Sequence, residues 1–393
     1  MIAQEYKAPS SVGRLQQRAF IVGGIALLIA IFGWIKSPEL FYHSYLTSYM
    51  LVLGIALGSL GLLMLQHLTS GYWGIAIRRP LEAATRTLPL LLVLFVPLLF
   101  GVKTLYFRWL EPSPNKEEAL SSFQQSYLTL HNFYIRAAIY FAVWLLLMFA
   151  FNAWSRQQDL RQQDRTLRRH LKLLAGPGII LYVFGISFAA IDWVMSIQPH
   201  WASTIYGFIY VAGELISSMA LMIIVVVMLS RTEPYASVVT KRVLHDLGKL
   251  LFAFLLLWAY FDFSQLLIIW SGNLPEEISF YRTRLTGGWG SLAVAILIFH
   301  FFVPFFLLLS RGLKRDSKLI PKVAAWMIFM RLVDLFWFTR PDLPGAHLAW
   351  LDFVLPVALF GIWLGFFAWH LQRQPILPLG EPKLAEVLAQ HEH

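Results

Sequence analysis

An acidic residue inside a long apolar run is the feature of this sequence with the clearest chemical potential. Residues 247–270 form a run long enough to cross a bilayer, and Asp262 lies in its interior. A carboxylate is costly in hydrocarbon, so such a group normally has a partner, faces a protein interior or carries function. We interpret Asp262 as a proton carrier or a quinone contact; a hydrogen bond that only joins two helices is the alternative.

Other ionisable side chains lie in neighbouring apolar runs and could act with Asp262. Glu214 and His300 are the lone ionisable groups in the interiors of the preceding and following runs. A lone histidine in a membrane is commonly a packing residue, but in series with two carboxylates it could relay protons. Arg331 and Asp334 are three residues apart, so they share a helix face and could pair. The candidate proton path is Asp262, Glu214, His300, Asp334, Arg331 and Asp192.

Composition restricts the class of protein that could hold these residues. Of the 393 residues, 58% are hydrophobic and 14% are charged, whereas a soluble domain carries about 25% charged residues. The mean hydropathy is +0.62. These values predict an all-α integral membrane protein. The net charge of +10 is then explained by basic loops rather than by nucleic-acid binding.

The sequence contains no cysteine. This excludes disulfides, CxxCH haem attachment and cysteine-ligated iron–sulfur clusters in this chain. Only His300 among the histidines lies deep in an apolar run, so we do not expect a b-type haem held between facing histidines. Redox work by this chain would therefore need a bound quinone or metal-bearing partner subunits.

Ten apolar runs of about 20 residues predict ten transmembrane helices. The first is read as a retained helix rather than a removable signal peptide, because no A-x-A cleavage site follows it. Prolines inside the runs, such as Pro304, predict kinks. The predicted helices are residues 19–35, 46–66, 88–107, 133–154, 175–194, 204–229, 247–270, 288–309, 319–338 and 349–371.

Two local patterns concern how the predicted helices pack. Gly54, Gly58 and Gly61 form a face of small residues that favours close helix contact. We expect this contact inside the bundle, with a dimer interface as the alternative. Residues 71–87 are too polar to span a membrane. They predict a short helix at the inner interface with Arg78 and Arg79 at the lipid headgroups.

Lysine and arginine counts in the loops predict the orientation. The N-terminus, the C-terminus and the even-numbered loops carry 23 of these residues, against six in the odd-numbered loops. Because cytoplasmic loops are enriched in Lys and Arg, both termini should be cytoplasmic. The polar groups then lie between the outer surface and the midplane, without a matching deep carboxylate on the inner side, which favours a half-channel. Four outer groups are candidate quinone contacts: Lys103, His131, Arg136 and Asp352.

Three segments resemble a known family. Residues 71–89 read GYWGIAIRRPLEAATRTLP, residues 190–207 read AIDWVMSIQPHWASTIYG, and residues 260–281 read YFDFSQLLIIWSGNLPEEISFY. They resemble signature segments of the ActF subunits of bacterial alternative complex III, in the polysulfide-reductase-like (NrfD-like) membrane family. The third segment is the most specific, and the resemblance covers nearly the whole chain. Asp192, Asp262 and residues 273–277 stand at matching motif positions.

The resemblance implies a fold and a setting. The fold would be one membrane domain over residues 1–393, with four-helix bundles at 46–194 and 204–338 and flanking helices at 19–35 and 349–371. The complex, respiratory or photosynthetic, oxidises quinol, commonly menaquinol, in the bacterial cytoplasmic (inner) membrane. Electrons pass through an iron–sulfur subunit and haem-c subunits to a periplasmic acceptor. A related larger NrfD-like subunit is the stronger candidate for the quinol site, and membrane lipids surround both.

Three hypotheses of function follow. In the first, the chain is a non-metal subunit of a quinol:electron-acceptor oxidoreductase that contributes a proton half-channel and a quinone contact, and it is not catalytic alone. In the second, it only anchors the redox subunits, and its polar residues hold helices together. In the third, it is a stand-alone ion-coupled transporter, although no inverted repeat is visible in the sequence.

Overall fold

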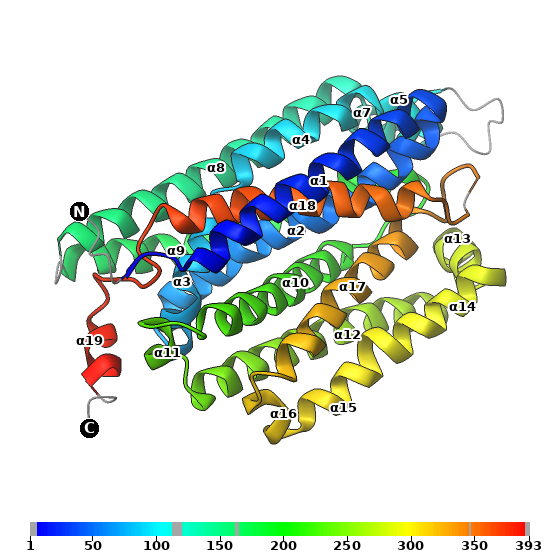
Figure 1. Cartoon of the computed structure of the whole chain (residues 1–393). Coiled ribbons are helices and arrows are strands. Elements are labelled where there is room, and N and C mark those ends of the chain that lie inside the picture. The colour runs from blue at the N-terminus through cyan, green and yellow to red at the C-terminus, as the bar shows by residue number, and fades with distance from the viewer. Residues whose placement is uncertain (1–5, 112–119, 162–164, 346, 390–393) are drawn as a thin grey trace.

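The computed structural model describes residues 6–111, 120–161, 165–345 and 347–389, and every regular element in these ranges is a helix (Figure 1). Eight helices in this part of the chain are long and apolar enough to cross a membrane. The prediction of a multi-pass, all-α membrane protein is confirmed. The eight are α1 (Ser10–Lys36), α2 (Pro38–Thr69), α8 (Leu130–Leu160), α9 (Arg165–Trp193), α10 (Tyr206–Leu229), α12 (Lys241–Gly272), the helix Gly287–Leu309 and α18 (Leu351–Gln372).

Two further predicted spans have helices that differ from this simple pattern. Helices α3 (Tyr72–Thr85) and α4 (Leu88–Phe100) form a pair bent by 41°, which counts as a ninth span if it crosses as one unit. Helix α17 (Ile320–Thr339) has the length to span but carries three charged residues, Lys322, Arg331 and Asp334. Short helices complete the described chain: α5 (Val102–Leu105), α6 (Phe107–Leu110), α7 (Ser122–Tyr127), the 3₁₀ helix η3 (Met195–Ile197), α11 (Tyr235–Val238), α13 (Pro275–Arg284), α16 (Arg311–Arg315) and α19 (Pro382–Ala389).

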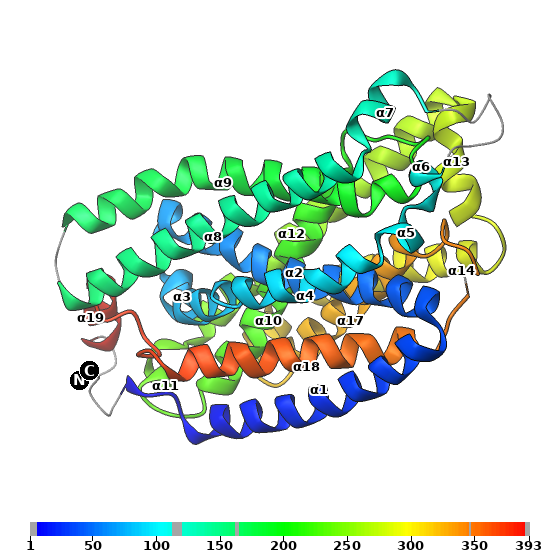
Figure 2. The same ribbon diagram turned by 90° about the horizontal axis from the view of Figure 1, so that it is seen from above.

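Helix α2 lies at the centre of the molecule. Its residues from Phe41 to Met64 are buried without a break, as expected for a helix that is apolar on all sides. It contacts α1, α3, α4, α9, α10, α17 and α18. Helices α1 and α18 lie side by side along one edge (Figures 1 and 2). The outward face of α1 exposes Ile21, Ile25 and Leu28, which suits contact with lipid.

The glycine face of α2 packs closely against other helices of the same chain. A Cβ added at Gly58 would lie 2.3 Å from the carbonyl oxygen of Glu214 on α10, and one at Gly61 would lie 2.8 Å from the ring of Tyr182 on α9. Only glycine permits so close an approach of the backbones. The predicted contact inside the bundle is therefore confirmed, and it determines the position of Glu214.

Helix α3 corrects one prediction. It is helical as expected, but residues Gly74 to Thr85 are all buried. Arg78 and Arg79 are each only 2% exposed, so they do not extend to lipid headgroups. They face the protein interior because Glu82 on the same helix pairs with both guanidinium groups, and Asp159 on α8 pairs with Arg79. Helix α3 lies at the same end of the molecule as the first turn of α1 and α19, while α13 lies at the opposite end (Figures 1 and 2).

Candidate functional site

The centre of the buried polar groups is an ion pair on α17. Arg331 and Asp334 pair through Nη1 and Oδ2, and their side chains are 3% and 1% exposed, which confirms the predicted pairing. The guanidinium packs on the backbone of α10, where a Cβ at Gly213 would lie 2.2 Å from its Cζ. It also lies 5.3 Å from the ring centroid of Tyr210. Gly213 thus allows the charge of Arg331 to lie against α10.

Glu214 occupies the contact between α2, α9 and α10. The Tyr182 hydroxyl donates to its Oε2 at 2.8 Å. Its other oxygen, Oε1, is buried and has no hydrogen-bond partner among the described residues. On α2, Gly54 lies against the Glu214 side chain, and a Cβ at Gly54 would lie 3.1 Å from the Glu214 Cγ. Glu214 therefore has one fixed oxygen and one that remains available to accept a hydrogen bond.

Asp262 lines a cavity of about 630 Å³ between α12, α17 and the helix Gly287–Leu309. Asp334 lines the same cavity, together with Tyr281, Trp258 and Trp337. Asp262 is half-buried and forms no ion pair or hydrogen bond within the described part of the chain. An apolar cavity with a few polar groups is the usual form of a small-molecule or water-accessible site. The structure therefore brings two of the predicted carboxylates to one wall.

His300 lies in a distorted part of its helix. This helix consists of α14 (Gly287–Ile296), a π-helical turn (Leu297–Phe302) and α15 (Val303–Leu309). The π-helical turn ends two residues before Pro304, where a kink was predicted, and such turns occur frequently at functional sites. The His300 ring is fully buried and meets Trp258 edge to face at 4.5 Å. Neither ring nitrogen has a partner among the described residues.

Arg331 lies among these groups. It pairs with Asp334, which lines the cavity beside Asp262, and it packs on Gly213, the neighbour of Glu214; His300 contacts Trp258, which lines the same cavity. We call the five ionisable residues the Arg331 cluster: Arg331, Asp334, Glu214, Asp262 and His300. Direct side-chain contacts do not connect its members into a chain of hydrogen bonds, so proton transfer between them would need water. The sequence did not single out Tyr182, because one tyrosine among 15 carries no distinguishing pattern.

Asp192, the sixth residue of the predicted proton path, makes a different set of contacts. Arg136 donates from Nε to Asp192 Oδ2 at 2.7 Å, and Tyr140 donates to the same oxygen at 2.7 Å. Arg136 was predicted as a quinone contact, so two residues assigned to different roles form one ion pair. This pair joins α8 to α9.

The other three candidate quinone contacts do not meet at one place. Lys103 and His131 are exposed. Asp352 lines a second apolar cavity, of about 790 Å³, which His347 and Ser44 also line. Ser44 Oγ donates to Asp352 Oδ1 at 2.5 Å, and the Ala349 N–H donates to Oδ2 at 2.8 Å. Only Asp352 of the four candidates thus lines either of these two cavities.

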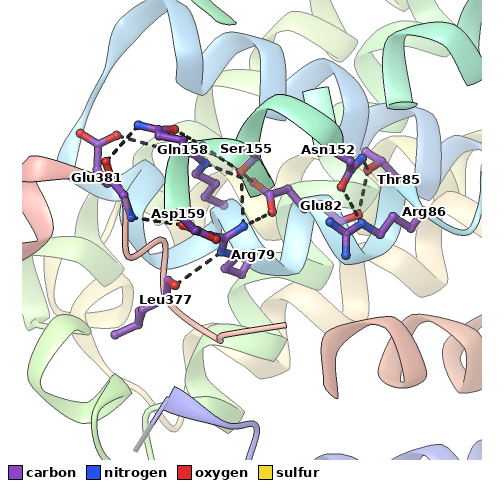
Figure 3. A network of polar contacts seen from close by, with 12 residues as sticks. Arg79, Glu82, Thr85, Arg86, Asn152, Ser155, Gln158, Asp159, Leu377 and Glu381 are labelled. Atoms are coloured by element: carbon purple, nitrogen blue, oxygen red, sulfur yellow. Dashed lines mark hydrogen bonds and ion pairs between the residues drawn. The ribbon is translucent and has the colours of Figure 1, made fainter. Parts of the chain in front are cut away.

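A second buried network lies between α3 and α8 (Figure 3). Glu82 is fully buried and pairs with Arg78 Nε at 3.1 Å and Arg79 Nη1 at 2.5 Å. Ser155 Oγ also donates to it at 2.5 Å, and Arg79 pairs in addition with Asp159. The sequence did not single out Glu82, because its segment was expected to lie at the membrane interface. Two arginines hold Glu82, which suits a structural anion better than a mobile proton carrier.

Comparison with known proteins adds no assignment. No family model matches the chain, and no curated protein matches it. Among the described residues, no group of three or more His, Asp or Glu side chains could hold a metal ion.

Proposed function

We propose that this chain is a membrane subunit of a quinol-oxidising electron-transfer complex of the alternative complex III type, in which it contributes a proton half-channel. The subunit would span the membrane ten times, with α3–α4 and α17 as the ninth and tenth spans, and both termini would be cytoplasmic. Its partners would be a related larger membrane subunit, an iron–sulfur subunit and haem-c subunits.

The observation that carries the proposal is the cavity shared by Asp262 and Asp334. Ionisable residues at membrane depth commonly mark proton or ion pathways. Asp334 already has a cationic partner, because it forms an ion pair with Arg331. Asp262 is the carboxylate on this wall without a cationic partner in the described chain, and its exposed side faces a space large enough for water. Asp262 is therefore the group we assign to proton exchange.

The remaining members of the Arg331 cluster extend the proposed path inward. Glu214 has one oxygen free to accept a hydrogen bond, and His300 has two ring nitrogens without partners in the described residues. Arg331 pairs with Asp334 and packs on Gly213, the neighbour of Glu214. A buried cation favours the ionised form of a nearby carboxyl group and the neutral form of a nearby imidazole, so Glu214 could release a proton and His300 could accept one.

The quinone part of the proposal centres on Asp352. The cavity that it lines has apolar walls and a few polar groups, Ser44 and His347 among them. This combination fits an amphipathic ring with an apolar tail. Bound quinol would supply electrons and protons, whereas this chain would position the ring and accept a hydrogen bond at the Asp352 carboxylate.

Substitution of Asp262 tests the proton path. Asp262→Asn keeps the size of the side chain but removes its ability to take up a proton. We expect proton-coupled quinol oxidation in membrane vesicles to fall by about 100-fold or more, the scale on which removal of a positioned proton-transfer group acts. The complex should still assemble, because Asp262 forms no polar contact within the described chain.

Asp246→Asn is the matched control, because Asp246 lies on the same helix in an exposed pair with Lys249. It should retain normal turnover and coupling. If Asp262→Asn also had normal turnover and coupling, the proton-path assignment would be wrong. If it instead lost stability while each folded molecule kept full activity, the purely structural role would be favoured.

A further inference from the structure

A basic pocket lies at the end of the molecule that carries α19, apart from the Arg331 cluster. It has a volume of about 490 Å³. Five basic side chains line it against a single carboxylate: Arg78, Arg168, Arg169, Lys172 and Lys383, with Glu381. A pocket with such an excess of positive charge attracts anions.

Three of these cations have no ion-pair partner in the described part of the chain. Arg168, Arg169 and Lys172 lie within the first two turns of α9 as described, and none forms an ion pair with a described residue. Like charges four residues apart on a helix repel each other, and cations near a helix N-terminus oppose the helix dipole. A bound anion would relieve this repulsion between the three side chains.

Two buried polar groups without partners also line the pocket. His67 is 9% exposed and Gln66 is 4% exposed. The His67 Nε2 and the Gln66 Oε1 have no hydrogen-bond partner among the described residues. The His67 ring is held by stacking on Phe151, with ring centroids 5.5 Å apart. Buried polar atoms are nearly always hydrogen-bonded, so these two atoms are available to a ligand: an imidazole N–H can donate to an anion, and an amide oxygen can accept from a protonated ligand oxygen or from water.

The remaining basic residues are fixed in place by the neighbouring network. Arg78 Nη2 donates to Gln158 at 2.6 Å, and Arg78 Nη1 pairs with Glu381 at 3.4 Å. Lys383 donates to the carbonyl of Ser70 at 2.5 Å. Figure 3 shows that Gln158 and Glu381 also belong to the network around Arg79. One wall of the pocket is therefore held by hydrogen bonds and ion pairs, whereas the α9 wall presents three cations that pair with no described residue.

We propose that this pocket binds a phosphate group, carried either by the headgroup of an anionic phospholipid or by free inorganic phosphate. Arginine and lysine donate several strong hydrogen bonds to phosphate oxygens, and basic pockets at the ends of transmembrane helices suit phospholipid headgroups. The side of α9 that follows the pocket is apolar and open. Leu173 and Ile180 are 60% and 58% exposed, and a Cβ at Gly176 would meet nothing within 4 Å. An acyl chain could lie along this face while the phosphate occupies the pocket.

The test uses the purified full chain, depleted of lipid in detergent. Native mass spectrometry would measure binding of phosphatidylglycerol in competition with phosphatidylcholine, and equilibrium dialysis would measure binding of inorganic phosphate. We expect preferential binding of the anionic lipid. A triple variant, Arg168→Gln, Arg169→Gln and Lys172→Gln, should weaken this binding about 100-fold, because each basic residue near a membrane surface contributes roughly fivefold.

Two control variants separate a built pocket from general surface charge. The triple variant Lys241→Gln, Arg242→Gln and Arg311→Gln removes the same charge from exposed positions outside the pocket, so it should retain the binding. His67→Phe keeps the stacking on Phe151 without changing a surface charge, and it should still weaken phosphate binding. If the α9 triple variant does not fold, the binding measured for His67→Phe still tests the proposal.

The outcomes distinguish the source of the phosphate and can overturn the proposal. Selective loss of phosphatidylglycerol binding in the α9 and His67 variants supports a lipid headgroup, and selective loss of inorganic phosphate binding supports the free ion. The pocket would be contradicted as a phosphate site if both triple variants lost binding of the anionic ligand equally. It would also be contradicted if the wild-type chain neither preferred phosphatidylglycerol to phosphatidylcholine nor bound inorganic phosphate. None of these results depends on the proposed electron-transfer complex.

Discussion

Replacement of Gly58 by alanine would test how the contact between α2 and α10 positions Glu214. The added Cβ would lie 2.3 Å from the Glu214 carbonyl oxygen and 2.7 Å from its carbonyl carbon. Relaxed C···O contacts are roughly 3.3 Å long, so the two helices would have to separate by about 1 Å. The obstacle is backbone, which cannot rotate away as a side chain could.

The expected loss of stability is the difference between two effects. Overpacking of a buried contact costs up to about 3 kcal/mol. Alanine gains about 1 kcal/mol over glycine from its higher helix propensity. We therefore expect Gly58→Ala to lower the free energy of unfolding by about 2 kcal/mol. Titration with a denaturing detergent in mixed micelles would measure this change.

Gly24→Ala is the matched control for helix propensity. Gly24 lies inside α1, and a Cβ there would meet nothing within 4 Å. This variant should be neutral or more stable by up to about 1 kcal/mol. If both glycine variants changed stability by the same amount, the close contact between α2 and α10 would be refuted, together with the position that it gives Glu214.

Two further predictions concern buried charges, and the same unfolding assay checks both. Arg331→Gln or Asp334→Asn alone should each lower the free energy of unfolding by about 3–5 kcal/mol, because a buried charge loses its partner. The double variant should recover most of that loss. If the losses of the two single variants simply added in the double variant, the ion pair would be contradicted. Glu82→Gln should cost less, about 1–3 kcal/mol, since Arg78 and Arg79 lose their shared carboxylate but keep Glu381 and Asp159. The exposed Glu276→Gln should be neutral, and equal stability of these two glutamine variants would contradict the network in Figure 3.

The spans could be predicted from the sequence because the bilayer imposes a simple requirement. A helix must present about 20 apolar residues to cross it, and runs such as residues 204–229 satisfy this visibly. The structure extends several of these helices beyond their predicted ends, as in α12 (Lys241–Gly272), whose polar ends lie outside the apolar run. Apolar length alone cannot show where a helix continues into the polar region.

Pairing of polar groups could be predicted only where it is local. Arg331 and Asp334 are three positions apart on one helix, so their contact follows from helix geometry. Tyr182 and Glu214 are 32 positions apart, and no periodicity joins them. Helix α3 was misplaced for the same reason. Its charges suggest a surface position until Ser155, from a distant part of the sequence, supplies a buried partner.

Isolation of the chain under mild conditions tests the central claim most directly. The chain would be tagged and extracted in mild detergent, and the material that accompanies it would be analysed for haem, iron, quinone and quinol-oxidising activity. We predict that haem-c subunits, an iron–sulfur subunit and a larger related membrane subunit come with it, and that the assembly oxidises quinol. A lone membrane protein without redox partners would contradict the proposed function and would favour an ion-coupled transporter.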